Sequence, residues 1–119
     1  MLGSGHSGKT GLRGLILLPV VFIFAVCAEA AGISDISGGI WHSGAVDGTG
    51  AVWTWGANVA GQLGDGTSEN ANYPVRVIDT THPTGYLYDV TSVDGGRGTG
   101  SLFESHTIAL QQDGTVRAW

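Results

Sequence analysis

Residues 3–10 read Gly-Ser-Gly-His-Ser-Gly-Lys-Thr, a full match to the G-x-x-x-x-G-K-T loop that binds nucleotide phosphates. Such a loop needs a buried strand before it and a helix after it, so that backbone N–H groups converge on the phosphates. Only Met1 and Leu2 precede the string, and an apolar run containing Pro19 follows it. We therefore interpret the string as a chance match that binds no nucleotide.

Two histidines, His42 and His106, could act as metal ligands or as an acid–base pair. They occupy equivalent positions of an internal repeat, and such a residue usually serves the fold, for instance by bonding a neighbouring backbone carbonyl. Residues 65–67 (Asp-Gly-Thr) with Asn70 could suggest Ca²⁺, but they provide too few oxygens and favour a turn. Cys27 is the sole cysteine, so no disulfide or thiolate metal cluster is expected. The sequence predicts no catalytic, cofactor or metal site, and hence no enzyme.

The elements that position these residues repeat along the chain at a constant offset of 64 residues. Residues 42–46 (His-Ser-Gly-Ala-Val) and 50–55 (Gly-Ala-Val-Trp-Thr-Trp) return as residues 106–110 (His-Thr-Ile-Ala-Leu) and 114–119 (Gly-Thr-Val-Arg-Ala-Trp). Asp and Gly residues between the two halves of each copy are typical of hairpin turns. We therefore predict hairpins over residues 42–55 and 106–119, with Val52 and Thr54 on one face.

The segment between the hairpins also reads as turns and strands. Residues 56–67 contain four glycines, which excludes a stable helix and indicates a structured loop. Residues 73–78 are predicted to form a strand, with Pro74 at its beginning or on a sheet edge. Residues 80–86 form a connection, and residues 87–93 open the second copy as a strand.

The first 30 residues differ from the rest. Lys9 and Arg13 precede an apolar run over residues 15–26, and Ala28-Glu29-Ala30 has the small-x-small form of a cleavage site. These are the three parts of a secretory signal peptide, and the apolar run is shorter than the roughly 18 residues that a membrane span needs. We expect cleavage after Ala30 and a secreted or cell-surface protein, with an uncleaved anchor as the alternative.

Composition limits the class of protein and its partners. The 119 residues include 21 glycines, and 42% are hydrophobic but only 13% charged, which favours an all-β protein rather than a disordered chain. The whole chain has a formal charge of −5. After cleavage, Arg76, Arg97 and Arg117 would face nine carboxylates, so nucleic-acid binding is not expected. No membrane association is expected after cleavage either.

Several dispersed positions agree in order and spacing with a known repeat: Gly39, His42-Ser43, Ala45, Gly50, Val52, Trp55-Gly56, Asn58, Gly61-Gln62-Leu63-Gly64, Asp65-Gly66 and Pro74-Val75. In these positions the sequence resembles the repeat of the regulator of chromosome condensation family, particularly its bacterial versions. The resemblance covers residues 35–79 well and residues 89–119 partly.

The resemblance implies an all-β fold, a partial β-propeller, whose blades are four-stranded antiparallel sheets around a channel. On this basis residues 1–30 are a signal helix, residues 31–88 the first repeat and residues 89–119 a truncated second repeat, about one and a half blades. The positions expected to serve the repeat structurally are Gly39, His42, Gly50, Trp55, Gly56, Gly61, Gln62, Leu63, Gly64, His106, Gly114 and Trp119.

An insertion lengthens the second copy between Gly96 and His106. Insertions in repeats map to loops on one face, often the binding face, so Arg97, Leu102 and Phe103 are a candidate partner-binding loop. Trp41 and Trp53 are not repeated as tryptophan and could also serve a partner.

The resembling family includes nucleotide-exchange factors for small GTPases and secreted bacterial members such as a β-lactamase inhibitor. The signal peptide favours a non-catalytic, exported scaffold that binds a protein. The alternatives are a guanine-nucleotide exchange factor, or a propeller module attached to a hydrolase or adhesin. Because repeat arrays generally need about three units, residues 31–119 alone are expected to be loosely packed or oligomeric, with exposed apolar faces.

Overall fold

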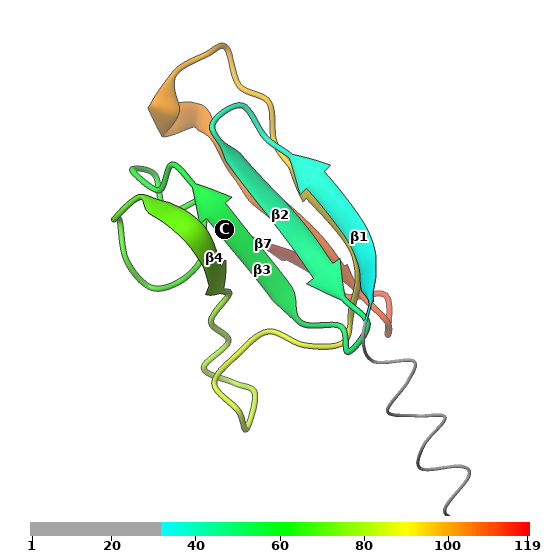
Figure 1. Cartoon of the computed structure of the whole chain (residues 1–119). Helices are drawn as coiled ribbons and strands as arrows, with labels where there is room; N and C mark the ends of the chain where they lie inside the picture. Colours follow the sequence, from blue (N-terminus) through cyan, green and yellow to red (C-terminus); the bar gives the residue numbers. More distant parts are fainter. Residues whose placement is uncertain (1–31) are drawn as a thin grey trace, which may run out of the picture. The chain divides into compact units, whose positions relative to one another are not determined.

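In the computed structural model, residues 32–119 are described, and they form two antiparallel β-sheets, which confirms the all-β fold of partial propeller blades (Figure 1). The predicted signal peptide falls outside the described residues. The first sheet has the order β1-β2-β3-β4 and the second the order β5-β6-β7. The bounds are β1 Ile33–Gly38, β2 His42–Asp47, β3 Val52–Gly56, β4 Ala71–Arg76, β5 Val90–Gly95, β6 Thr107–Gln111 and β7 Val116–Ala118.

Both predicted hairpins are present, as β2–β3 and β6–β7. In the first turn the Asp47 carboxylate accepts a hydrogen bond from the Thr49 backbone N–H at 2.9 Å, and Gly50 has a φ of +80°. The second turn repeats this arrangement with Asp113 and Thr115 at 2.8 Å. An Asp side chain that bonds the backbone two residues later fixes a turn, so each hairpin is specified locally.

The strands outside the hairpins differ from the sequence prediction. Strand β1 was not predicted, because its Asp and Ser residues obscure the apolar alternation. Strand β5 begins at Val90 rather than Leu87, since the Leu87 N–H bonds the Val77 carbonyl at 2.9 Å and so belongs to the connection. Strand β4 lies two residues earlier than predicted, and Pro74 sits in this edge strand as expected. The insertion contains a short 3₁₀ helix, Leu102–Glu104, which was also not predicted.

The hydrophobic core lies between the two sheets. Gly44 in β2 leaves room for the side chain of Val93 in β5, which lies 3.5 Å from the point where a Gly44 Cβ would be. Strands β1 and β5 also contact each other (Figure 1). The two sheets therefore pack face to face as neighbouring blades. The buried cluster comprises Val46, Val52, Val77, Leu87, Val90, Val93 and Ala109, with Trp119 packed against it.

Polar bonds join β1 to β5. The Asp35 carboxylate accepts hydrogen bonds from the Val93 N–H and the Ser92 hydroxyl, both at 2.8 Å. The Ser37 hydroxyl accepts from the Gly95 N–H and donates to the Asp94 carboxylate, both at 2.9 Å. Residues 35 and 92, and likewise residues 37 and 94, occupy equivalent positions of the two blades. They are 57 residues apart rather than 64 because the insertion comes after them in the second copy. The same position of each blade therefore contacts its counterpart in the other.

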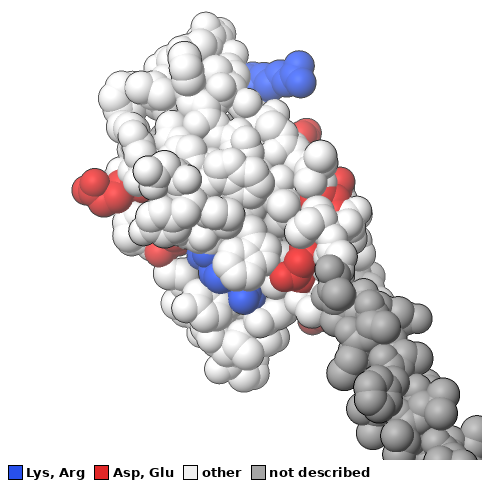
Figure 2. Space-filling view, viewed as in Figure 1, with Lys and Arg blue, Asp and Glu red and all other residues white. Residues whose placement is uncertain are grey.

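Arg76 fastens the connection of residues 77–89 to the first sheet. Its guanidinium carbon lies 4.9 Å from the ring centroids of Trp53 and Tyr86 and 4.7 Å from that of Tyr88. Cation–π contacts of this kind contribute about 0.5–2 kcal/mol each. Charged side chains are otherwise scattered over a mostly uncharged surface in the view of Figure 2. No helix among the described residues is long and apolar enough to cross a membrane.

Candidate functional site

Asn58 organises the loop that follows Trp55-Gly56. It is fully buried, and its amide nitrogen donates hydrogen bonds to the Asp65 carboxylate and the Thr67 carbonyl, both at 3.0 Å. Its amide oxygen accepts from the Leu63 N–H at 2.9 Å. Burial alone would raise the pKa of Asp65, but hydrogen bonds from Thr67 and Asn58 outweigh it and lower this pKa. The Asn58 side chain therefore supplies hydrogen bonds that hold this glycine-rich loop in shape, in place of the backbone hydrogen bonds of a strand or helix.

The loop presents a backbone carbonyl to the second sheet. The carbonyl oxygen of Gln62 accepts hydrogen bonds from the Thr107 hydroxyl at 2.8 Å and from the indole N–H of Trp119 at 3.0 Å. The same Thr107 hydroxyl lies 2.8 Å from Nε2 of His42. Three parts of the chain thus meet in one network, the blade junction, formed by His42, Gln62, Thr107 and Trp119.

The proton positions of the blade junction follow from its donors. Because Thr107 gives its single hydroxyl hydrogen to the Gln62 carbonyl, it must accept from His42 Nε2–H. His42 is then neutral with an unprotonated Nδ1, an atom that is buried and has no hydrogen-bond partner. Burial, together with repulsion from His106, lowers the pKa of His42. Sequence reasoning expected a structural histidine bonded to a backbone carbonyl; the structure gives a side-chain hydroxyl instead.

Acid is expected to weaken the packing of the two blades. His42 has a lowered pKa in the folded chain, so its contribution is complete above the ordinary value of 6.5 and declines as the pH falls below it. Denaturant titrations at several pH values should show this decline, and H42Q should remove most of it. H82Q, which changes a half-buried histidine of the connection outside the blade junction, is the control and should leave the decline in place. An unchanged pH dependence in H42Q would contradict the assignment.

Gly39 and Gly96 each lie against the ring of a repeat histidine, where a side chain would have no room. A Cβ on Gly39 would lie 2.3 Å from Cε1 of His42, and one on Gly96 would lie 2.3 Å from Cε1 of His106. His42 is buried and held by Thr107, whereas His106 is exposed.

Replacing Gly39 with Ala is therefore expected to be more damaging than replacing Gly96 with Ala. The ring of His42 cannot move aside without breaking the blade junction, so G39A should cost about 1–3 kcal/mol, as overpacking does. The exposed ring of His106 can rotate away, so G96A should cost well under half of that. Unfolding of both variants in urea measures the difference, and equal costs would count against the junction.

The other predicted repeat positions lie in turns, in the buried interior or on an outer face. Gly56 has a φ of +112°, and a Cβ there would lie 2.5 Å from the Trp41 carbonyl oxygen. Gly114 has a φ of +88° in the β6–β7 turn. Leu63 is fully buried. Trp55, the equivalent of Trp119, is half-buried on the side of the first sheet that faces away from the second.

The insertion projects from one end of the two sheets, beside the β1–β2 turn that contains Trp41 (Figure 1). Phe103 is 74% exposed, Trp41 52% and Leu102 39%. Arg97 is exposed at the start of the same loop. A hydrogen bond within the loop holds its shape, because the Glu104 carboxylate accepts from the Thr99 N–H at 3.1 Å. Three predicted contact residues thus lie on one ordered loop.

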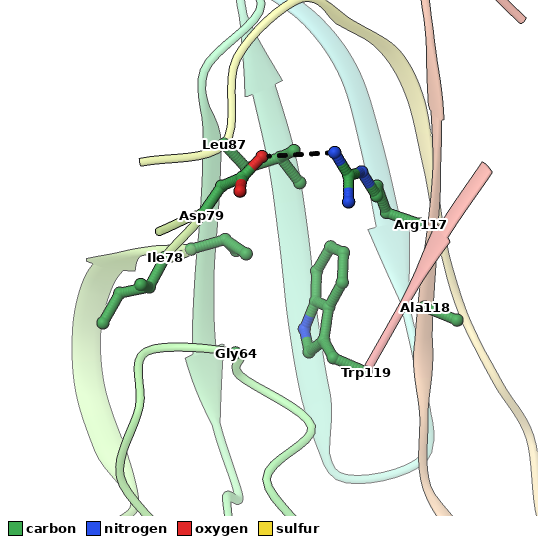
Figure 3. A pocket seen from close by; sticks show the side chains of 8 residues that line it. Gly64, Ile78, Asp79, Leu87, Arg117, Ala118 and Trp119 are labelled. Atoms are coloured by element: carbon green, nitrogen blue, oxygen red, sulfur yellow. Dashed lines mark hydrogen bonds and ion pairs between the residues drawn. The ribbon is translucent and has the colours of Figure 1, made fainter. Parts of the chain in front are cut away.

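A small pocket lies between the connection and the second sheet (Figure 3). Gly64, Ile78 and Trp119 line it, and Asp79 and Arg117 form an ion pair across it at 3.5 Å. This pair is partly exposed and therefore weak. Within residues 32–119, no group of three or more His, Cys, Asp or Glu side chains is placed to hold a metal ion. The lining offers no nucleophile with an adjacent base.

The fold and the blade junction define a pair of propeller blades, and the family follows from comparison with known proteins. Residues 49–101 match the family model of the regulator of chromosome condensation (RCC1) repeat. Residues 49–101 therefore form an RCC1-type repeat. The match begins in the β2–β3 turn and ends in the insertion, so it spans the loop with Asn58 and Gln62.

Related proteins agree with this family. The chain is 34% identical over 87 residues to protein pim1 of Schizosaccharomyces pombe, an alignment covering 73% of the chain and 15% of that protein. It is 34% identical over 114 residues to the X-linked retinitis pigmentosa GTPase regulator homolog of Caenorhabditis elegans, covering 96% of the chain and 7% of that protein. It is 30% identical over 121 aligned positions to the human E3 ubiquitin-protein ligase HERC2, covering 98% and 2%. The chain thus spans a small part of each relative.

Proposed function

We propose that this chain is part of a non-catalytic, exported scaffold that binds another protein, and that the loop of residues 97–105 is its contact surface. The observation that supports the proposal is the exposure of Phe103 and Leu102 on an ordered loop that begins with Arg97. Aromatic and Arg side chains dominate the binding energy of protein interfaces. A rigid blade pair that carries an exposed loop suits recognition, because loops on rigid scaffolds commonly hold binding residues.

The contact surface can be tested with a photo-reactive amino acid at position 103 of the full chain, expressed in its native cells. We expect a specific cross-linked protein that is absent when the same group stands at Thr84, an exposed position on the connection. The cross-linked protein, once purified, should bind the unmodified chain. F103A should then weaken this binding at least about tenfold, while T84A should not. Equal binding by both variants would exclude the loop.

Export is supported by the composition of residues 1–30 and has its own test. Mass spectrometry of secreted material is expected to find a mature N-terminus close to Ala31. A soluble cytoplasmic pool with an intact Met1 would contradict export. That outcome would not contradict the proposal that residues 97–105 form a contact surface.

Regulation of a GTPase is the second candidate, and one observation favours it: a relative at 34% identity is named a GTPase regulator homolog. In that case an intracellular small GTPase would be the protein that contacts the loop. Demonstrated export of the native chain would rule this function out. Accelerated nucleotide release from a GTPase, lost in F103A, would favour it.

A further inference from the structure

The insertion of residues 97–105 folds back on itself. A Cβ on Gly98 would lie 2.8 Å from the Cβ of Glu104 and 2.9 Å from its carbonyl oxygen, so the two residues are in contact. Arg97 precedes Gly98 in the chain, and Phe103 precedes Glu104. The closed loop therefore brings the backbone of Arg97 close to that of Phe103.

The β1–β2 turn lies at the base of this loop. A Cβ on Gly95, the last residue of β5, would lie 2.5 Å from the backbone nitrogen of Gly39, the first residue after β1. Trp41 follows Gly39 by two residues, and Arg97 follows Gly95 by two residues, so both leave the sheets from the same region. Both are exposed. The end of the molecule that carries the insertion thus presents Trp41 together with the loop (Figure 1).

Arg97 differs from the other two arginines of residues 32–119. Arg76 packs against three aromatic rings. Arg117 takes part in an ion pair, and its Nε donates a hydrogen bond to the Gln111 side chain at 3.1 Å. Arg97 is exposed, and no residue from 32 to 119 forms an ion pair or a hydrogen bond with its guanidinium. The charge of Arg97 therefore has no counter-ion among the described residues.

The carboxylates nearest to Arg97 in the sequence are engaged with other groups. Glu104 accepts hydrogen bonds from the hydroxyl and the backbone N–H of Thr99, and these bonds lower the pKa of Glu104. Asp94 accepts a hydrogen bond from the Ser37 hydroxyl of the first sheet. Carboxylates outnumber cations in this chain, and yet none of those in the described part is placed against the Arg97 guanidinium.

We propose that the protein bound by this loop presents a carboxylate to Arg97, next to an apolar site that receives Phe103. The inference rests on the proposed function of residues 97–105 as a contact surface and adds the chemistry of the partner. A guanidinium donates two parallel N–H···O bonds to a carboxylate, and these bonds fix the direction of approach as well as matching the charge. Arg97 is then the residue that selects an acidic partner.

The apolar side chains at this end of the molecule would strengthen such a pair. Leu102, Phe103 and Trp41 are exposed there. Contacts that surround a binding residue exclude water from it, and two opposite charges attract more strongly where water is excluded. The pair of Arg97 with a carboxylate is thus expected to slow dissociation of the complex, as covered charge pairs do, and not only to speed the encounter.

A phage-displayed library of random linear peptides serves as the probe and is selected on the full chain. Clones that also bind F103A are discarded, so that the retained peptides depend on Phe103. We expect these peptides to contain Asp or Glu close to an apolar residue, and we expect the same selection on R97Q to lose this acidic enrichment. T84E changes the net charge by the same amount at an exposed residue of the connection, so it is the matched control and should retain the enrichment.

The affinities of one selected peptide and of the same peptide with its Asp or Glu changed to the amide complete the test. R97Q should weaken binding of the acidic peptide at least about tenfold, chiefly through faster dissociation, and should leave binding of the amide form nearly unchanged. R97K should recover only part of the loss, because an ammonium group does not donate two parallel bonds. Circular dichroism of each variant confirms that its sheets are folded.

Three results would each overturn the inference: Phe103-dependent peptides without acidic residues, equal binding of the acidic peptide by R97Q and the wild type, or no Phe103-dependent peptide at all. The proposed function is decided separately, by cross-linking from position 103. A specific cross-linked protein whose binding is weakened by F103A but not by R97Q would refute the carboxylate and leave the contact loop in place.

Discussion

Replacing Asn58 with Asp is expected to lower the free energy of unfolding by about 3–5 kcal/mol, the cost of an uncompensated buried charge. The amide nitrogen of Asn58 lies 3.0 Å from both the Asp65 carboxylate and the Thr67 carbonyl. Asp would place an oxygen against both acceptors and leave the fully buried site with two facing carboxylates. The loop of residues 57–67 should then lose its shape, and the Gln62 carbonyl should leave the blade junction.

N70D is the matched control for this substitution. The Asn70 side-chain oxygen accepts the Asn58 backbone N–H at 2.8 Å, and an Asp at the exposed position 70 retains such an oxygen. Guanidinium titrations of the wild type, N58D and N70D measure the three free energies. A cost for N58D no larger than that for N70D would show that the buried amide is not the centre of the loop.

Replacing Gly64 with Ala is expected to cost about 2–4 kcal/mol, because two penalties add at one position. Gly64 has a φ of +67°, and a Cβ there would lie 2.6 Å from Nε1 of Trp119. Gly61 provides the control, because its φ of +80° imposes the same backbone strain with nothing within 4 Å of its Cβ position. G61A should therefore cost only about 1–2 kcal/mol.

The difference between G64A and G61A isolates the contact with the second blade. It should disappear when Trp119 is also replaced by Ala, because the clash then has no partner. Thermal or urea unfolding of the two single variants and of both combined with W119A gives this comparison. Persistence of the difference without Trp119 would contradict the proposed contact.

The hairpins could be predicted from the sequence because their information is local. Asp47 and Asp113 fix turns through bonds to backbone groups two residues away, and each turn is flanked by recurring residues. Strand β1 could not be predicted in the same way, since Asp35 and Ser37 are polar for a non-local reason. They bond backbone N–H groups of β5 that are 58 residues distant. The polar residues of β1 therefore gave no sign in the sequence that this strand packs against β5.

The blade junction was only partly predictable. The recurrence of His42 and the two tryptophans marked them as repeat positions, and the glycine content of residues 56–67 marked a structured loop. Nothing in a single sequence indicated that the Gln62 carbonyl, rather than its side chain, receives Thr107 and Trp119. Asn58 was part of the resemblance, but its central role depends on four side-chain hydrogen bonds to Leu63, Asp65 and Thr67, which only the folded loop brings together. The sequence position of Arg97, Leu102 and Phe103 suggested a loop, and the structure places them on one.

The loop of residues 57–67 has hydrogen bonds within itself and hydrogen bonds to the second sheet, and these two sets can form at different times during synthesis. Bonds from Asn58 reach residues no more than 12 positions away, whereas the Gln62 carbonyl waits for Trp119, which lies 57 positions later. Closing a short loop costs less entropy than closing a long one. During synthesis the loop can therefore take shape before Trp119 has been made, and the second sheet then packs against a loop that is already formed.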